Sequence, residues 1–230
     1  MKKPTSLILP LLLLTGLYWF LRNSDPPAPS SQTTQVAWQR ESFATMPLGD
    51  LPPNWAAPRG SIQIVEKAGV HMLCFQPEPM VEGRVLLPGV LRSGGTIRAR
   101  MSGESAKRAQ PRFAVGLNNE AEYHLRYVFA EQRLELITPN SVEVNGTAIP
   151  EDKLLSSVPL AIPNTAPLWL ELRMNADGLC EGRCWAEGTP RPTHPTLTHP
   201  INRPAGLLHA TFHAAPFALA PIYVDRVEWQ

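Results

Sequence analysis

The arginine, glutamate and tryptophan residues that could bind a ligand lie in segments whose apolar and polar residues alternate. In a β-strand every second side chain points to the same side, so one face can enter a core while the other stays polar. Arginine is frequent at the polar positions, and its planar guanidinium donates hydrogen bonds to carboxylates and hydroxyl groups and stacks on aromatic rings. The polar positions that we select as candidate ligand-binding residues are Arg98, Arg100, Arg112, Arg126, Glu171, Arg183 and Trp185.

On one polar face these residues could form a groove for a carbohydrate. Arg98, Arg100, Arg126 and Glu171 would supply hydrogen bonds. The indole of Trp185 would supply a flat apolar surface for a sugar ring. The alternative is a solvated sheet face on which arginine and glutamate side chains pair across neighbouring strands.

Carboxylates that could act as a general acid or base are few. Glu171 and Glu135 are the candidates, and each stands alone among arginine and apolar neighbours. Glycoside hydrolysis generally needs two carboxyl groups, about 5–5.5 Å or about 6.5–9.5 Å apart. The sequence contains no Gly-x-Ser-x-Gly, phosphate-binding or HExxH motif. We therefore predict no catalytic residue, although two strands could still bring a carboxylate pair together.

Candidate metal ligands are sparse in the sequence. His194 and His199 each precede a proline, while His209 and His213 fall on one face of a predicted strand. Zinc needs three or four converging ligands, and these spacings match no zinc motif, so we predict no metal site. Asp225 could cap a turn or bind a structural calcium ion, which requires six to eight oxygen ligands.

The cysteines Cys74, Cys180 and Cys184 are interpreted as small core hydrophobic residues. On one strand, Cys180 and Cys184 would lie about 13 Å apart at roughly 3.3 Å per residue. A disulfide needs Cα atoms within about 7 Å. The alternative is a disulfide from Cys74 to one of the other two.

Positioning these side chains requires a set of short strands. The alternation predicts strands at residues 61–66, 70–75, 95–101, 112–118, 121–130, 133–138, 168–175, 179–186, 206–213 and 222–229. Residues 118–137 contain good helix formers, but their alternation favours a hairpin that turns near residues 131–132. Asn145-Gly146 is typical of a two-residue hairpin turn. Residues 139–167 and 187–205 are predicted to be long irregular connections.

Composition favours an all-β domain and argues against a nucleic-acid partner. The 230 residues include 25 prolines, which disfavour helix interiors and central strands. The formal net charge of +1 lacks the basic surplus that nucleic-acid binding requires.

The N-terminus carries the features of an export signal. Lys2 and Lys3 precede an apolar run from Leu7 to Leu21, without a small-residue cleavage site after it. We predict a signal anchor or signal peptide at residues 1–22, a Pro/Ser/Thr-rich linker at 23–35 and one domain at 36–230. The domain would then lie in the bacterial periplasm, held at the inner membrane, or be secreted after cleavage.

Scattered positions between residues 43 and 229 resemble a known fold family. They include the segments at 51–55, 95–101, 122–126, 169–172 and 222–227. In these segments the chain resembles concanavalin A-like jelly-roll domains of the laminin G and glucanase type, and most of all bacterial 3-keto-disaccharide hydrolase-type domains. The resemblance implies an antiparallel jelly-roll sandwich. The Glu-x-Asp-x-Glu strand of the glucanase branch is missing, and the fold alone does not determine a function.

These observations lead to three hypotheses for the function. The first is an envelope-anchored, lectin-like module that binds a glycan or a glycan-bearing partner without catalysis. The second is a structural or assembly module of a membrane complex, and the third is a glycoside-processing enzyme. No cofactor is predicted, and the sequence leaves the oligomeric state open.

Overall fold

The computed structural model divides the chain into Met1–Val36 and Ala37–Gln230, and the structure described below belongs to the second unit. The described residues are 37–77, 82–91, 94–103, 111–118, 122–144, 147–163, 167–201, 208–215 and 220–230. They contain strands and no helix, so none of them forms a helix able to cross a membrane. The predicted anchor at 1–22 and linker at 23–35 lie outside the described residues.

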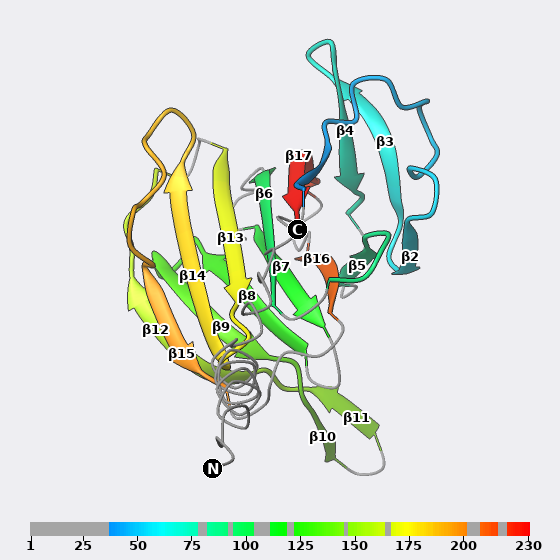
Figure 1. The fold of residues 1–230 in the computed structure, drawn as a ribbon. Coiled ribbons are helices and arrows are strands. Elements are labelled where there is room, and N and C mark those ends of the chain that lie inside the picture. The colour runs from blue at the N-terminus through cyan, green and yellow to red at the C-terminus, as the bar shows by residue number, and fades with distance from the viewer. Residues whose placement is uncertain are drawn as a thin grey trace, which may run out of the picture. The chain divides into compact units, whose positions relative to one another are not determined.

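The strands form two antiparallel sheets, one stacked on the other (Figure 1). The first has the order β15 (Leu197–Pro200), β14 (Leu179–Ala186), β13 (Leu168–Met174), β6 (Gly95–Gly103), β17 (Ile222–Trp229), β4 (Val70–Phe75) and β3 (Ile62–Lys67), with β1 (Gln39–Glu41) also paired to β17. The second has the order β12 (Lys153–Pro159), β9 (Arg133–Thr138), β8 (Glu122–Val128), β7 (Arg112–Asn118), β16 (His209–Ala215), β5 (Gly83–Leu86) and β2 (Ala56–Arg59). A separate hairpin joins β10 (Ser141–Val144) to β11 (Thr147–Pro150).

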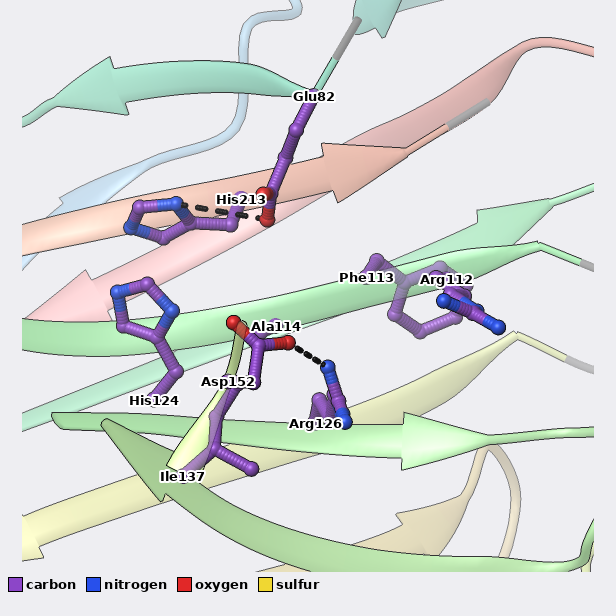
Figure 2. Close-up of a pocket in the computed structure, with 9 residues that line it drawn as sticks. All are labelled: Glu82, Arg112, Phe113, Ala114, His124, Arg126, Ile137, Asp152 and His213. Carbon is purple, nitrogen blue, oxygen red and sulfur yellow. Dashed lines mark hydrogen bonds and ion pairs between the residues drawn. The ribbon is translucent and has the colours of Figure 1, made fainter. Parts of the chain in front are cut away.

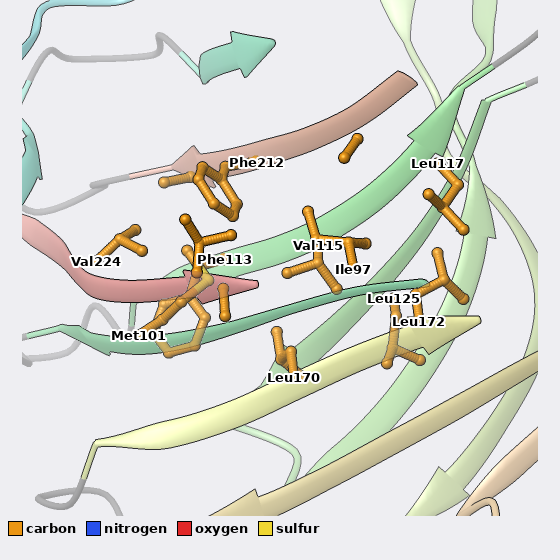
Figure 3. Packing of buried hydrophobic residues seen from close by; sticks show 14 of the residues in the cluster. Ile97, Met101, Phe113, Val115, Leu117, Leu125, Leu170, Leu172, Phe212 and Val224 are labelled. Carbon is orange, nitrogen blue, oxygen red and sulfur yellow. The ribbon is translucent and has the colours of Figure 1, made fainter. Parts of the chain in front are cut away.

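The core lies between the sheets and is built from the alternate apolar residues of facing strands (Figure 3). Ile97 and Met101 of β6 and Leu170 of β13 point inward from the first sheet, and Val115 and Leu125 point inward from the second. Full burial of one such side chain contributes roughly 1.5–3 kcal/mol. The core therefore fixes which side chains of each strand point to the outer faces.

Each predicted strand overlaps a strand of the described structure, whereas β1, β2 and β5 were not predicted. The hairpin interpretation of residues 118–137 is correct, because β8 and β9 pair antiparallel around a turn at 129–132. The two long connections were predicted wrongly as irregular, since β10, β11 and β12 lie in the first and β15 in the second. The strands among these that join the two main sheets are β12 and β15. Both are edge strands, and their partly exposed residues lack the strict alternation of a strand that packs on a core.

The three cysteines are free and buried. Cys180 and Cys184 are two of the core side chains of β14, and Cys74 is buried on β4. The interpretation as core hydrophobic residues is confirmed.

Candidate functional site

Five of the predicted ligand-binding residues lie on the outer face of the first sheet, which we call the arginine face. They are Arg98, Arg100, Glu171, Arg183 and Trp185. Register places them side by side, because Glu171 is opposite Arg98 on β6 and opposite Arg183 on β14. The pairing of β6, β13 and β14 therefore brings these five predicted residues together.

The charged groups of the arginine face bind one another. Arg100 donates from Nε and Nη2 to the two carboxylate oxygens of Asp225, at 2.7 and 2.6 Å. Arg183 donates to Glu171 at 3.0 Å, and Arg191 donates to the same carboxylate at 2.8 Å. Both oxygens of Asp225 are therefore engaged by arginine, which leaves little reason to assign this residue to calcium.

An aromatic pair sits beside these ion pairs. Trp169 and Trp185 stack with ring centroids 5.8 Å apart and planes 7° from parallel. The Trp169 indole donates to Glu187 at 2.6 Å. The half-buried Trp185 is thus covered on one side by Trp169. The described contacts of the arginine face match the alternative of cross-strand pairing.

The other two predicted residues, Arg112 and Arg126, lie on the second sheet, on β7 and β8. Arg126 donates to Glu135 at 2.6 Å and also pairs with Asp152. The Glu135 carboxylate is fully buried. The expectation of one site that combines Arg98, Arg100, Arg126, Glu171 and Trp185 is therefore wrong, because β8 and the strands of the arginine face belong to different sheets.

Two adjoining pockets open on the outer face of the second sheet, and we call them together the histidine groove. Figure 2 shows the smaller of the two. Their volumes are about 60 and about 340 Å³, and they share Glu82, His124 and His213. The other polar residues that line them are Arg59, Arg84, Arg112, Glu122, Arg126 and Asp152. The groove thus gathers charged groups of both signs around two histidines.

Three neighbouring strands position the histidines. β8 contributes Glu122, His124 and Arg126 at every second residue, so all three project from the same face. Register places Gly116 of β7 between His124 and Thr211 of β16. The ring centroids of His124 and His213 are only 3.6 Å apart.

Burial and neighbouring charges set the protonation of these groups. Burial lowers the pKa of His213 to about 3, so the imidazole is neutral at physiological pH. Burial alone would raise the pKa of Glu122, but contacts with His124 and His213 outweigh it and hold that pKa well below its usual range. The pKa of the half-exposed Glu82 is raised by its partial burial. The pocket therefore contains two carboxylates with opposite pKa shifts.

Sequence reasoning missed most of the histidine groove. The signal that could have found part of it is the spacing of Glu122, His124 and Arg126 on one strand face. The sequence groups His213 with His209 on one face of a strand, and His213 reaches His124 only because β16 pairs with β7, a strand nearly 100 residues earlier in the sequence. The alternation of residues within one segment does not predict which distant strand the segment pairs with.

The two sheets define a concanavalin A-like jelly-roll fold, as predicted. Solved structures with a similar fold include the GH16 protein of the Bacteroides ovatus mixed linkage glucan PUL in complex with a G4G4G3G product. This structure has a TM-score of 0.56 and 9% identity over 84% of this chain and 99% of that chain.

Two further structures extend the comparison. A lectin from Bauhinia forficata in complex with GalNAc has a TM-score of 0.52 and 6% identity, over 84% of this chain and 97% of the lectin. A Bacillus subtilis protein of unknown function with a galectin-like fold has a TM-score of 0.54 and 11% identity, over 84% and 94%. No family model and no curated protein matches the sequence. At these identities the likeness establishes the fold alone.

Proposed function

We propose that the protein recognises a carbohydrate in the histidine groove. The observation that carries this proposal is the pocket of about 340 Å³, whose lining includes Arg59, Arg84 and Glu82. A sugar hydroxyl both donates and accepts hydrogen bonds, so a lining with donors and acceptors side by side suits it. The adjoining pocket extends the same lining through Arg112 and Asp152.

The fold is consistent with carbohydrate recognition but does not determine it. The similar structures include a lectin in complex with GalNAc and a GH16 protein in complex with a G4G4G3G product. Jelly rolls of one architecture host many functions, so a role for this chain must come from its own groove.

A second candidate function is hydrolysis of the bound glycoside. The observation that favours it is the carboxylate pair of Glu82 and Glu122, which line the same pocket and have opposite pKa shifts. A raised pKa suits a general acid, and a lowered pKa suits an ionised base or nucleophile. Incubation of bound oligosaccharides with the protein, followed by a reducing-end assay, separates turnover from simple recognition.

The proposal is tested by screening the purified full chain in mild detergent against an array of oligosaccharides. We expect saturable binding to at least one glycan class. Glu82→Gln and Asp152→Asn each remove a negative charge from the groove at constant size, and we expect both to weaken that binding. An array without a hit, obtained with a folded protein, would overturn the proposal and favour an assembly module.

We further propose that residues 1–22 hold the domain at the inner membrane on its periplasmic side, on the linker at 23–35. The basic and apolar composition of the N-terminus supports this placement. Protease treatment of spheroplasts should degrade the domain while an alkaline wash leaves the chain in the membrane fraction. A chain that remains protected from protease would contradict this topology.

A further inference from the structure

Glu122, His124 and His213 form a cluster that carbohydrate recognition does not explain. Glu122 Oε1 lies 2.9 Å from His124 Nε2 and 3.2 Å from His213 Nε2. Each residue offers one ligand atom, and these atoms all lie within 4.8 Å of one another. In a tetrahedral zinc site, bonds of about 2.0–2.2 Å place neighbouring ligand atoms roughly 3.3 Å apart. The two short separations of the cluster are close to this value.

Two atoms of the cluster are buried without a well-directed hydrogen bond. They are His124 Nε2 and Glu122 Oε1, although only 2.9 Å separates them. The ring nitrogen therefore does not point along the line to the carboxylate oxygen. Glu122 Oε1 has the Arg84 guanidinium as an ion-pair partner, with Nη2 at 2.9 Å, whereas a buried ring nitrogen such as His124 Nε2 costs free energy when it has no directed hydrogen bond. Ligand atoms of one metal ion have this arrangement, because each directs its lone pair to the ion and not to the neighbouring ligand.

The chemistry of the donors is also suitable. An imidazole nitrogen offers a lone pair to a metal ion, and the His124 and His213 side chains are both almost fully buried. Glu82 Oε1 lies 3.9 Å from His213 Nδ1, on the ring nitrogen that faces away from Glu122. A carboxylate on this side of the ring is a common outer partner of a metal-binding histidine, although 3.9 Å is longer than a hydrogen bond. His213 Nε2 lies 3.1 Å from Thr211 Oγ1, so binding of an ion at Nε2 would replace this contact.

Gly116 lets the side chains of the cluster approach the sheet closely. A Cβ at this position would lie 2.3 Å from Thr211 Oγ1 and 2.8 Å from His124 Cδ2. The His124 ring can therefore lie directly against the backbone of β7, with its plane tilted by 36° from that of His213.

We propose that Glu122, His124 and His213 bind one divalent transition-metal ion of the zinc class, with a further coordination position open to the histidine groove. Two imidazoles and one carboxylate suit zinc or cobalt better than magnesium or calcium, which prefer oxygen ligands. The site does not depend on the proposed carbohydrate function, because its ligands are the protein's own side chains.

Arg84 gives the proposal a distinctive consequence. Its Nη2 lies 2.9 Å from Glu122 Oε1, so a positive charge faces the ion site. This charge repels a cation. Removing it in Arg84→Gln should tighten metal binding, whereas removing a ligand should weaken it.

The test is a calorimetric titration of the full chain with ZnCl₂ alone, after chelator treatment and without a polyhistidine tag. We expect one ion per chain. Glu122→Gln, which keeps the side-chain size, should weaken binding at least about tenfold, since even outer-shell changes cost about 10–100-fold. The matched control is His209→Gln on β16, the strand of His213; His209 is an exposed histidine, so the change should leave the affinity unchanged. Zinc that fails to saturate the wild type, or that binds Glu122→Gln equally well, would overturn the proposal.

A spectroscopic measurement on the wild type avoids any dependence on variants that fail to fold. The electron paramagnetic resonance spectrum of one equivalent of Cu²⁺ should show coupling to two imidazole nitrogens. A spectrum without nitrogen coupling would overturn the assignment. So would a nitrogen-coupled spectrum that His209→Gln abolishes while Arg84→Gln leaves the affinity for Cu²⁺ unaltered, because the ion would then lie elsewhere.

Discussion

At the scale of single residues, similar charged side chains have different roles on the two outer faces. On the arginine face Glu171 is buried and accepts hydrogen bonds from Arg183 and Arg191. In the histidine groove, by contrast, charged side chains line the wall of a pocket. Burial distinguishes Glu171 from the half-exposed Glu82 of the groove, because a buried charge needs its partners for the fold to be stable.

The Glu171→Ala variant tests the structural role of the arginine face. It leaves the almost fully buried Arg183 guanidinium without its nearest carboxylate, so the free energy of unfolding should fall by about 2–4 kcal/mol. Urea denaturation measures this loss. The control is Arg40→Ala, whose mostly exposed side chain lies 3.7 Å from Glu228 and should cost less than about 0.5 kcal/mol. Equal losses in the two variants would refute the structural role of Glu171.

The buried cysteines predict how stability depends on pH in the alkaline range. Burial raises the pKa of Cys74 to about 11 and of Cys180 to about 12. The unfolded chain ionises these thiols near pH 9 while the folded chain keeps them neutral. Their contribution to stability is therefore complete below about pH 9 and falls as the pH rises toward the folded values.

The pH dependence is measured by urea unfolding between neutral pH and pH 10.5. Each buried thiol adds a slope of up to about 1.4 kcal/mol per pH unit above its unfolded pKa. Cys180→Ala should flatten the decline by one such contribution, while lysine and tyrosine titrate equally in both proteins. Identical slopes would mean that Cys180 is not protected by burial.

At the scale of elements, alternation predicts a strand where one face packs on the core. That condition holds for β6, β7, β13 and β14, and their predicted positions agree with the structure within two residues. It fails for β12 and β15, because an edge strand with partly exposed residues shows no strict alternation. Register between strands distant in sequence is not contained in either pattern, which is why the arginine face was predicted in part and the histidine groove was missed.

The close approach of the two sheets gives a prediction at this scale. A Cβ on Gly182 of β14 would lie 2.5 Å from Leu125 Cδ1 of β8. Gly182→Ala should therefore destabilise the protein by about 1–3 kcal/mol through overpacking. In a Leu125→Val background, Gly182→Ala should lower the free energy of unfolding by less, because valine has no Cδ1 methyl group at the position that clashes with the new Cβ. Strictly additive losses in denaturation experiments would show that these two residues are not in contact.

At the scale of the whole molecule, the jelly-roll fold brings together strands that are distant in the sequence. β5, β8 and β16 all contribute to the histidine groove, and they begin at residues 83, 122 and 209. The fold was recognisable from the sequence because scattered residues of its core strands resemble the family. The groove was not, because many segments that are distant in the sequence build it and no single one carries a motif.

The central claim is that the histidine groove, and not the arginine face, binds carbohydrate. The most direct measurement is calorimetric titration of an array-selected oligosaccharide into three proteins: the wild type, the Glu82→Gln/Asp152→Asn double variant and Trp185→Ala. Hydrogen bonds to charged groups contribute about 1.5–3 kcal/mol each, so the double variant should bind at least about tenfold more weakly. Trp185→Ala should bind like the wild type. Binding that is lost in Trp185→Ala and retained in the double variant would contradict the account and move the site to the arginine face.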